Sequence, residues 1–183
     1  MRRTYLLIGG AIALVAGFLL FRPDKLFADD PVEESLTQAF VTTPTTVVES
    51  DTATPSTNDT MTPSAAPSTV TSAEPTAVGS GPLVGIDHRA TGTATIYEQD
   101  GRYVLRLEDD TDIQNGPDLY VWIIEREIYE GGLPTGYIDL GKLKGNVGGQ
   151  NYDLPADFDL GLHRGVLIWC LRFAVPFAFA PLS

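Results

Sequence analysis

Residues 41–80 constrain most strongly how this chain can fold. They contain 12 threonines, 6 serines and 5 prolines, but no lysine, arginine or aromatic residue. A segment with so few large apolar side chains cannot offset the conformational entropy that folding costs, so the sequence predicts disorder there. The foldable part of the chain is therefore confined to the residues that follow, 81–183.

An uncharged apolar run, "TYLLIGGAIALVAGFLLF", occupies residues 4–21. As a helix it would span about 27 Å, close to the ~30 Å hydrocarbon core of a bilayer. A cleaved secretory signal is the alternative, because Arg2 and Arg3 give the chain a basic start. An uncleaved transmembrane signal anchor is favoured, since the run exceeds the usual apolar core of a signal peptide and is followed by Arg22 and Lys25 rather than a small-residue cleavage site.

The segment after this run decides the expected topology. Tracts rich in Thr, Ser and Pro are typical of stalks that hold a domain away from a membrane. We therefore expect residues 22–80 to be an extracytoplasmic stalk, with a cytoplasmic linker as the alternative. The sequence thus predicts a single-pass protein of the cell membrane with the bulk of the chain outside the cytoplasm.

From residue 81 onward, short β-type segments alternate with turn signals. "TGTATIY" (91–97) and "RYVLRL" (102–107) flank an Asp-Gly turn and predict a hairpin. "DLYVWII" (118–124) and "GVLIWCLRF" (165–173) are apolar on both faces and predict central strands, and "YIDLG" (137–141) predicts a short one. Because no convincing helical period runs through these residues, we expect an all-β domain, an antiparallel β-sandwich or barrel.

The charge and motif content exclude several functions. The formal net charge of −12 repels phosphate backbones, so nucleic acid is not an expected partner. No C-x-x-C pair, haem-attachment motif, phosphate loop or hydrolase nucleophile elbow is present. The acidic run "EDDTD" (108–112) lacks the spacing of a calcium-binding loop and is expected to be solvated, so no metal site is predicted.

Cys170 is the only cysteine of the chain. On the expected strand it shares a face with Arg172, and a basic neighbour favours the thiolate, whereas apolar burial leaves a thiol inert. Both a redox-active thiol and a small core side chain therefore remain open. Exported proteins usually pair their cysteines, which makes an unpaired one notable.

Three further polar residues are weaker candidates for a functional site. His88 could be a ligand or proton donor, or a loop histidine with its hydrogen bonds satisfied. His163 lies in a turn-like "GLHRG", where a structural role is expected. Asp118, at the start of a predicted strand, could be a site carboxylate, but hydrogen bonding to turn amides is favoured.

Four segments together carry a family resemblance: "HRATGTATIY", "GPDLYVW", "DLGKLKGNVGGQNYDLP" and "VLIWCLRFAVPFAFAPL". In this order they resemble the DM-thirteen domain, an extracellular module often found with DOMON domains and proposed for electron transfer. The resemblance covers residues 81–183. It implies a β-sandwich-like domain whose single cysteine acts in redox chemistry, either as a free thiol or by holding a prosthetic group such as haem.

Carried over to this chain, the resemblance implies a catalytic and cofactor-binding role for Cys170. It also matches His88 and the Gly116–Leu119 segment, and His88 becomes a second candidate cofactor ligand. The function expected from it is a membrane-anchored redox module that acts on a partner protein outside the cytoplasm. The alternative is a non-catalytic adhesion or ligand-binding β-sandwich with Cys170 in its core.

Overall fold

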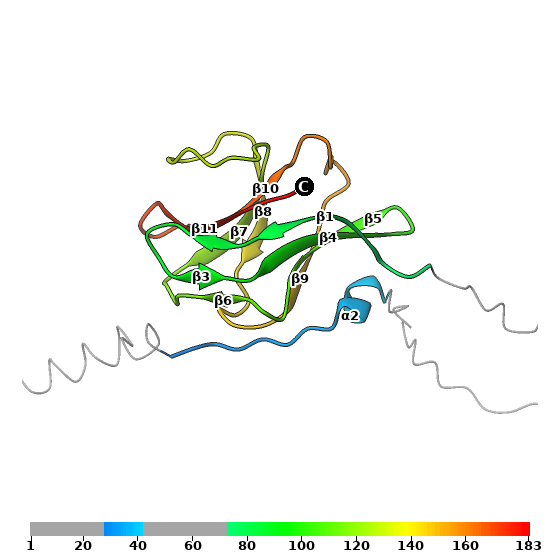
Figure 1. Cartoon of the computed structure of the whole chain (residues 1–183), viewed down its shortest axis with the longest axis horizontal. Helices are drawn as coiled ribbons and strands as arrows, with labels where there is room; N and C mark the ends of the chain where they lie inside the picture. Colours follow the sequence, from blue (N-terminus) through cyan, green and yellow to red (C-terminus); the bar gives the residue numbers. More distant parts are fainter. Residues whose placement is uncertain (1–27, 42–72) are drawn as a thin grey trace, which may run out of the picture.

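The structure is a computed structural model that describes residues 28–41 and 73–183 (Figure 1). Its elements are α2 (Leu36–Phe40), β1 (Thr76–Pro82), β2 (Val84–Gly85), β3 (Ala90–Thr91), β4 (Thr93–Gln99), β5 (Arg102–Leu107), β6 (Asp112–Ile113), β7 (Leu119–Ile124), β8 (Tyr137–Lys142), β9 (Gln150–Asp153), β10 (Gly165–Cys170) and β11 (Val175–Pro181).

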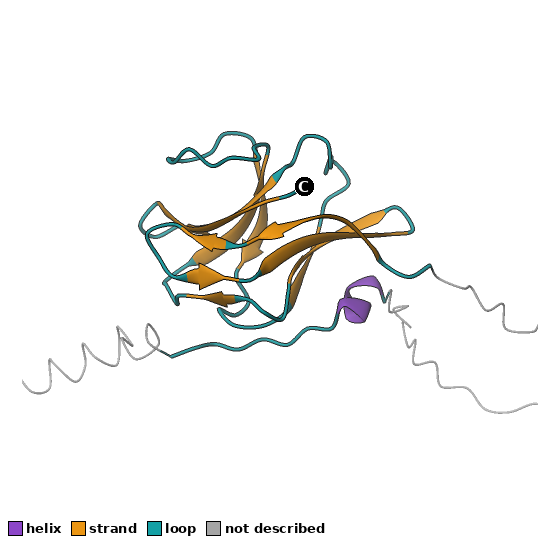
Figure 2. Ribbon diagram, viewed as in Figure 1, coloured by secondary structure: helices purple, strands orange, loops and turns teal. Residues whose placement is uncertain are grey.

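The strands form two main antiparallel sheets and a small pair (Figure 2). One sheet has the order β1-β4-β5-β9, the other the order β2-β11-β10-β7-β8, and β3 pairs with β6. Apolar side chains of both main sheets share one buried cluster, which includes Ile96 and Leu105 of the first sheet and Val121 and Ile168 of the second. The expected all-β antiparallel class is therefore confirmed, and two sheets around a common core are consistent with a sandwich.

The predicted hairpin and central strands are present. β4 and β5 join at Asp100 and Gly101, whose φ angles of 53° and 79° are those of a two-residue hairpin turn. β7 and β10 both lie inside their sheet. Their outward faces are buried as well, because Trp122 and Ile124 of β7 and Leu167 and Trp169 of β10 form a second buried cluster, which explains why these segments are apolar on both faces.

The end of β10 differs from the prediction. The strand stops at Cys170, and residues 171–174 form a turn that closes a hairpin with β11, in which Cys170 pairs with Val175. Ala174 adopts a left-handed φ of 53° in this turn. The expectation that Cys170 and Arg172 share a strand face is therefore wrong, since Arg172 belongs to the turn.

The folded part of the chain is larger than the sequence predicts. β1 begins at Thr76, before the expected boundary at residue 81. Residues 28–41, which belong to the predicted stalk, lie against the first sheet (Figure 1). The predicted transmembrane run, residues 4–21, and most of the stalk lie outside the described residues. Within residues 28–41 and 73–183, no helix has the length and apolar character needed to cross a membrane.

Residues 28–41, which we call the docked segment, follow the loop between β8 and β9. The amide of Val32 donates to the carbonyl oxygen of Val147 at 2.8 Å, and that of Glu34 donates to Gly149 at 2.8 Å. Glycines make this approach possible, because a β-carbon at Gly148 would collide with the carbonyl oxygen of Val32. The docked segment therefore binds through backbone pairing, as an added strand does.

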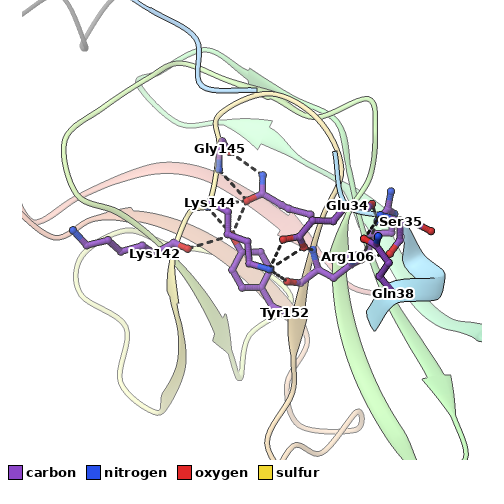
Figure 3. Close-up of polar contacts among 10 residues, drawn as sticks. Glu34, Ser35, Gln38, Arg106, Lys142, Lys144, Gly145 and Tyr152 are labelled. Atoms are coloured by element: carbon purple, nitrogen blue, oxygen red, sulfur yellow. Dashed lines mark hydrogen bonds and ion pairs between the residues drawn. The ribbon is translucent and has the colours of Figure 1, made fainter. Parts of the chain in front are cut away.

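Charged side chains complete this contact (Figure 3). The Glu34 carboxylate accepts hydrogen bonds from Lys144 Nζ at 2.8 and 2.9 Å and from the amide of Asn151 at 2.8 Å. Arg106, whose side chain is only 6% exposed, donates to the backbone oxygen of Glu34 at 2.7 Å. An acidic residue of the docked segment is thus held between two cations of the sandwich.

Glu34 makes this docking sensitive to pH. Partial burial raises the pKa of its carboxyl. The hydrogen bonds from Lys144 and Asn151 and the nearby positive charges lower the pKa by more than burial raises it, so the net pKa lies below the ordinary value of 4.5. A carboxylate whose pKa is lowered by folding stabilises the folded state at pH values above its ordinary pKa. This stabilisation is lost as the pH falls through the folded-state pKa. We expect amide exchange in the docked segment, divided by the intrinsic exchange rate at each pH, to quicken below about pH 4.5. In Glu34→Gln it should be faster at neutral pH and lose this dependence; an unchanged profile in the variant would contradict the assignment.

Candidate functional site

Cys170 lies at the end of β10 with its side chain in the core between the sheets. It is 0% exposed, and its Sγ donates a hydrogen bond to the backbone oxygen of Pro117 at 3.0 Å. Strand pairing places Leu119 of β7 and Val175 of β11 on either side of it. The thiol is therefore shielded from solvent and engaged with one loop.

That loop, residues 114–118, joins β6 to β7, and we call it the cover loop. The backbone oxygen of Asp118 accepts a hydrogen bond from the amide of Leu171 at 3.0 Å, which ties the loop to the turn after Cys170. Asp118 has a left-handed φ of 54°. Its carboxylate forms a 2.9 Å ion pair with Lys142 on the surface. A hydrogen bond from Lys142 and its positive charge lower the pKa of Asp118, so the carboxylate stays charged. Asp118 therefore holds the loop and does not point at the thiol.

His88 lies in the bend between β2 and β3, and Phe177 lies between it and Gly116 of the cover loop. Its ring stacks on Phe177 with 3.7 Å between the centroids and 15° between the planes. The Phe177 ring in turn fills the space beside Gly116, where an added β-carbon would lie 2.6 Å from Cζ. Phe177 thus lies between His88 and the cover loop, and no hydrogen bond joins His88 to Cys170 in the described chain.

The pocket beside the cover loop is small. A pocket of about 150 Å³ adjoins the cover loop and is lined by residues that include Gly116, Asp118 and Lys142, with Cys170 not among them. Pockets for drug-sized ligands measure about 300–1,000 Å³. Because Sγ is also fully buried and bonded to Pro117, the residues present do not fit a haem held by Cys170.

The acidic run 108–112 does not gather around a cation. Glu108 and Asp109 both pair with Arg106, the former at 2.8 Å. Asp110 accepts from the amide and hydroxyl of Thr93, each at 3.0 Å, and Asp112 pairs with Arg89 at 2.6 Å. Across residues 28–41 and 73–183, no three histidine, cysteine or acidic side chains are grouped as a metal ion would require.

His163 has the structural role that its turn suggests. It is buried, its Nδ1 accepts from the amide of Asp159 at 3.0 Å, and its ring stacks on Phe158 at 5.4 Å. The ring therefore stabilises the loop before β10 and is not available to the thiol.

Two features near the candidate site are not predicted from the sequence. Phe177, which separates His88 from the cover loop, lies seven positions beyond Cys170 on the returning strand, and only the hairpin register brings it back. The ring of Trp169 stacks on that of Trp122 on the outer face of the sheet, with centroids 5.2 Å apart. The apolar character of both faces of β7 and β10 was the one signal in the sequence for such a second cluster.

Comparison with known proteins gives one match. A family model described as "Electron transfer DM13" matches residues 83–182, which agrees with the resemblance drawn from the four sequence segments. No curated protein and no solved structure matches the chain.

Proposed function

The chain belongs to the DM13 family, described as electron transfer, and from this premise we propose that its sandwich exchanges electrons with a partner protein through the Cys170 thiol. We further propose that residues 4–21 anchor the chain in the cell membrane and that the domain acts outside the cytoplasm. The observation that carries the redox proposal is the position of the only cysteine at the end of β10, under a single short loop.

The proposed reaction is thiol–disulfide exchange. Cys170 loses its proton to water, and its sulfur forms a bond to one sulfur of a partner disulfide while the other partner sulfur leaves as a thiolate. The partner disulfide is reduced by this cleavage, and Cys170 is oxidised into a mixed disulfide. A second thiol of the partner then attacks the partner's sulfur in the mixed disulfide, the bond to Cys170 breaks, and Cys170 leaves as a thiolate. Cys170 is thereby reduced again while the partner regains a disulfide, so over a full cycle the exchange rearranges the partner's disulfide.

Access to the thiol requires the cover loop to move. The contacts that hold the loop over Cys170 include the Lys142–Asp118 ion pair at the surface, the Leu171–Asp118 hydrogen bond and the Cys170–Pro117 hydrogen bond. Exposed ion pairs contribute little stability, and loops with few buried contacts open at lower free energy than the core. The opened loop exposes Cys170 at the end of its strand.

The complete burial of Cys170 also favours a second candidate function. A thiol that is 0% exposed and donates to a backbone oxygen has the properties of a satisfied core residue. In that case the domain is an adhesion or ligand-binding module on the membrane, and Cys170 contributes packing alone.

The rate of exchange with an aromatic disulfide, dithiobis-nitrobenzoate, separates the two functions. We expect the folded full-length protein to release one aryl thiolate per chain faster than the chain unfolds globally, since only the cover loop has to open. The unfolding rate is measured in parallel by urea-jump kinetics. If the exchange rate equals the unfolding rate at several urea concentrations, the thiol is reached only through unfolding, and Cys170 belongs to the core.

Gly116→Ala tests the cover loop directly. A β-carbon there displaces the Phe177 ring, which is buried, and so weakens the packing beneath the loop. We expect exchange at Cys170 to become several-fold faster in the folded protein. Gly79→Ala is the matched control, because a β-carbon at Gly79 makes only an ordinary 3.6 Å contact with Leu160. Equal acceleration in both variants would indicate general destabilisation and not opening of the loop.

A further inference from the structure

Three aromatic rings form a continuous stack across the outer face of the second sheet. Trp122 of β7 stacks on Tyr137 of β8 with centroids 4.1 Å apart and planes 18° apart. On its other side it stacks on Trp169 of β10 at 5.2 Å and 21°. We propose that these rings carry single electrons from the surface at Tyr137 to Trp169, the residue before Cys170.

Strand register makes this stack a fixed part of the sheet. Trp122 pairs with Leu167 and Trp169 pairs with Tyr120, so the two indoles are diagonal neighbours on one face of adjacent strands. Tyr137 pairs with Ile124 on the other side of β7, and this places its ring beside Trp122. The three rings therefore come from three neighbouring strands and keep their spacing while the sheet is folded.

The burial of the rings gives the stack a direction. Trp122 and Trp169 are only 1% and 2% exposed, whereas Tyr137 is 40% exposed. Within the described chain, the buried indole Nε1 of Trp122 has no hydrogen-bond partner. An oxidised Trp122 has no acceptor for its proton and remains a cation radical, which readily takes an electron from a neighbour. Tyr137 can release its phenolic proton to water when it is oxidised.

The charge balance follows from these surroundings. An oxidising radical is reduced when it takes one electron from Trp169 or Trp122. The oxidised indole is then reduced by electron transfer along the stack, in which Tyr137 donates an electron to Trp122. Tyr137 loses its phenolic proton to water and ends as a neutral tyrosyl radical. The net result is one electron from Tyr137 to the oxidant and one proton from Tyr137 to solvent.

This inference adds a single-electron path to the proposed redox function, and its geometry does not involve the thiol. Cys170 points into the core between the sheets, whereas Trp169 points to the opposite face. The path could therefore be absent while Cys170 is reactive, or present while Cys170 is only packed. An experiment on the Cys170→Ala background separates the two.

Pulse radiolysis of the full-length Cys170→Ala protein with azidyl radical tests the path. The chain has only 2 tryptophans, both in the stack, so every tryptophanyl signal reports on it. We expect the tryptophanyl absorbance to decay as a tyrosyl absorbance rises, independently of protein concentration, because the transfer is intramolecular. In Tyr137→Phe, which keeps the ring and removes the phenol, we expect the tryptophanyl radical to live several-fold longer.

Tyr129→Phe is the matched control. Tyr129 packs against the same cluster, but its ring contact is with Phe179 at 6.1 Å, so the variant should keep the wild-type decay. Circular dichroism establishes that both variants are folded. A decay unchanged in Tyr137→Phe, or slowed equally in Tyr129→Phe, would overturn the assignment of Tyr137 as the end of the path.

Discussion

Replacing Cys170 with alanine should remove every mixed disulfide of this protein while the domain stays folded. The thiol fills a fully buried site and donates to Pro117, so its loss leaves a cavity of one sulfur atom and an unpaired carbonyl oxygen. We expect the free energy of unfolding in urea to fall by about 1–2 kcal/mol. Acid quenching of intact cells, followed by alkylation and non-reducing electrophoresis, should show a disulfide-linked adduct for the wild type and none for the variant at equal abundance.

Cys170→Ser is the control for the hydrogen bond. A hydroxyl can still donate to Pro117, but it brings a more polar group into an apolar site and does not form disulfides. We expect a stability loss similar to that of alanine and again no adduct. If the wild type itself carries no adduct, with a thiol that reacts only on unfolding, the proposed exchange is wrong and the residue serves packing alone.

Arg106→Met should destabilise the domain more than the removal of an exposed charge does. The guanidinium is nearly buried and bonds to Glu108, Asn151 and the backbone of Glu34, and it also contacts Asp109. Removing one partner of a buried ion pair costs about 3–5 kcal/mol. Because Glu108 is partly exposed and Asp109 is exposed, we expect a smaller loss, about 2–3 kcal/mol in urea unfolding, with faster amide exchange in the docked segment.

Arg102→Met provides the comparison from the same strand. Arg102 forms a 3.0 Å ion pair with Asp153, and both side chains are well exposed, at 47% and 75%. Such a pair contributes about 0–1 kcal/mol, so the variant should unfold close to the wild type. Equal losses in the two variants would show that burial of Arg106 is not the source of its effect.

The parts of the fold that local sequence determines are the parts that could be predicted. The Asp100–Gly101 turn sets the hairpin by its own backbone preference, and the apolar character of β7 and β10 identifies central strands. The early end of β10 could not be read in this way. Residues 171–174 carry no glycine or proline to mark a turn, and the left-handed residue there is Ala174.

The docked segment shows more clearly which contacts could not be predicted from the sequence. Glu34 meets Lys144 and Asn151, more than a hundred positions away, through polar and backbone contacts that leave no hydrophobic period in the sequence. The candidate site shows both cases. Cys170 could be singled out as a candidate because it is the only cysteine, whereas its burial beneath Pro117 and the position of Phe177 beside His88 depend on tertiary packing.

The docked segment changes what cleavage of the Thr/Pro-rich tract would do. Residues 42–72 connect this segment to β1, so both ends of the connection lie on the same sandwich. A cut between them breaks the polypeptide but leaves the backbone pairing of Val32 with Val147 and the Glu34–Lys144 ion pair. We therefore expect the two fragments to stay together as a noncovalent complex, in the manner of a split protein. Cleavage in the tract therefore does not by itself separate the sandwich from the residues before the cut, which requires the docked segment to be released as well.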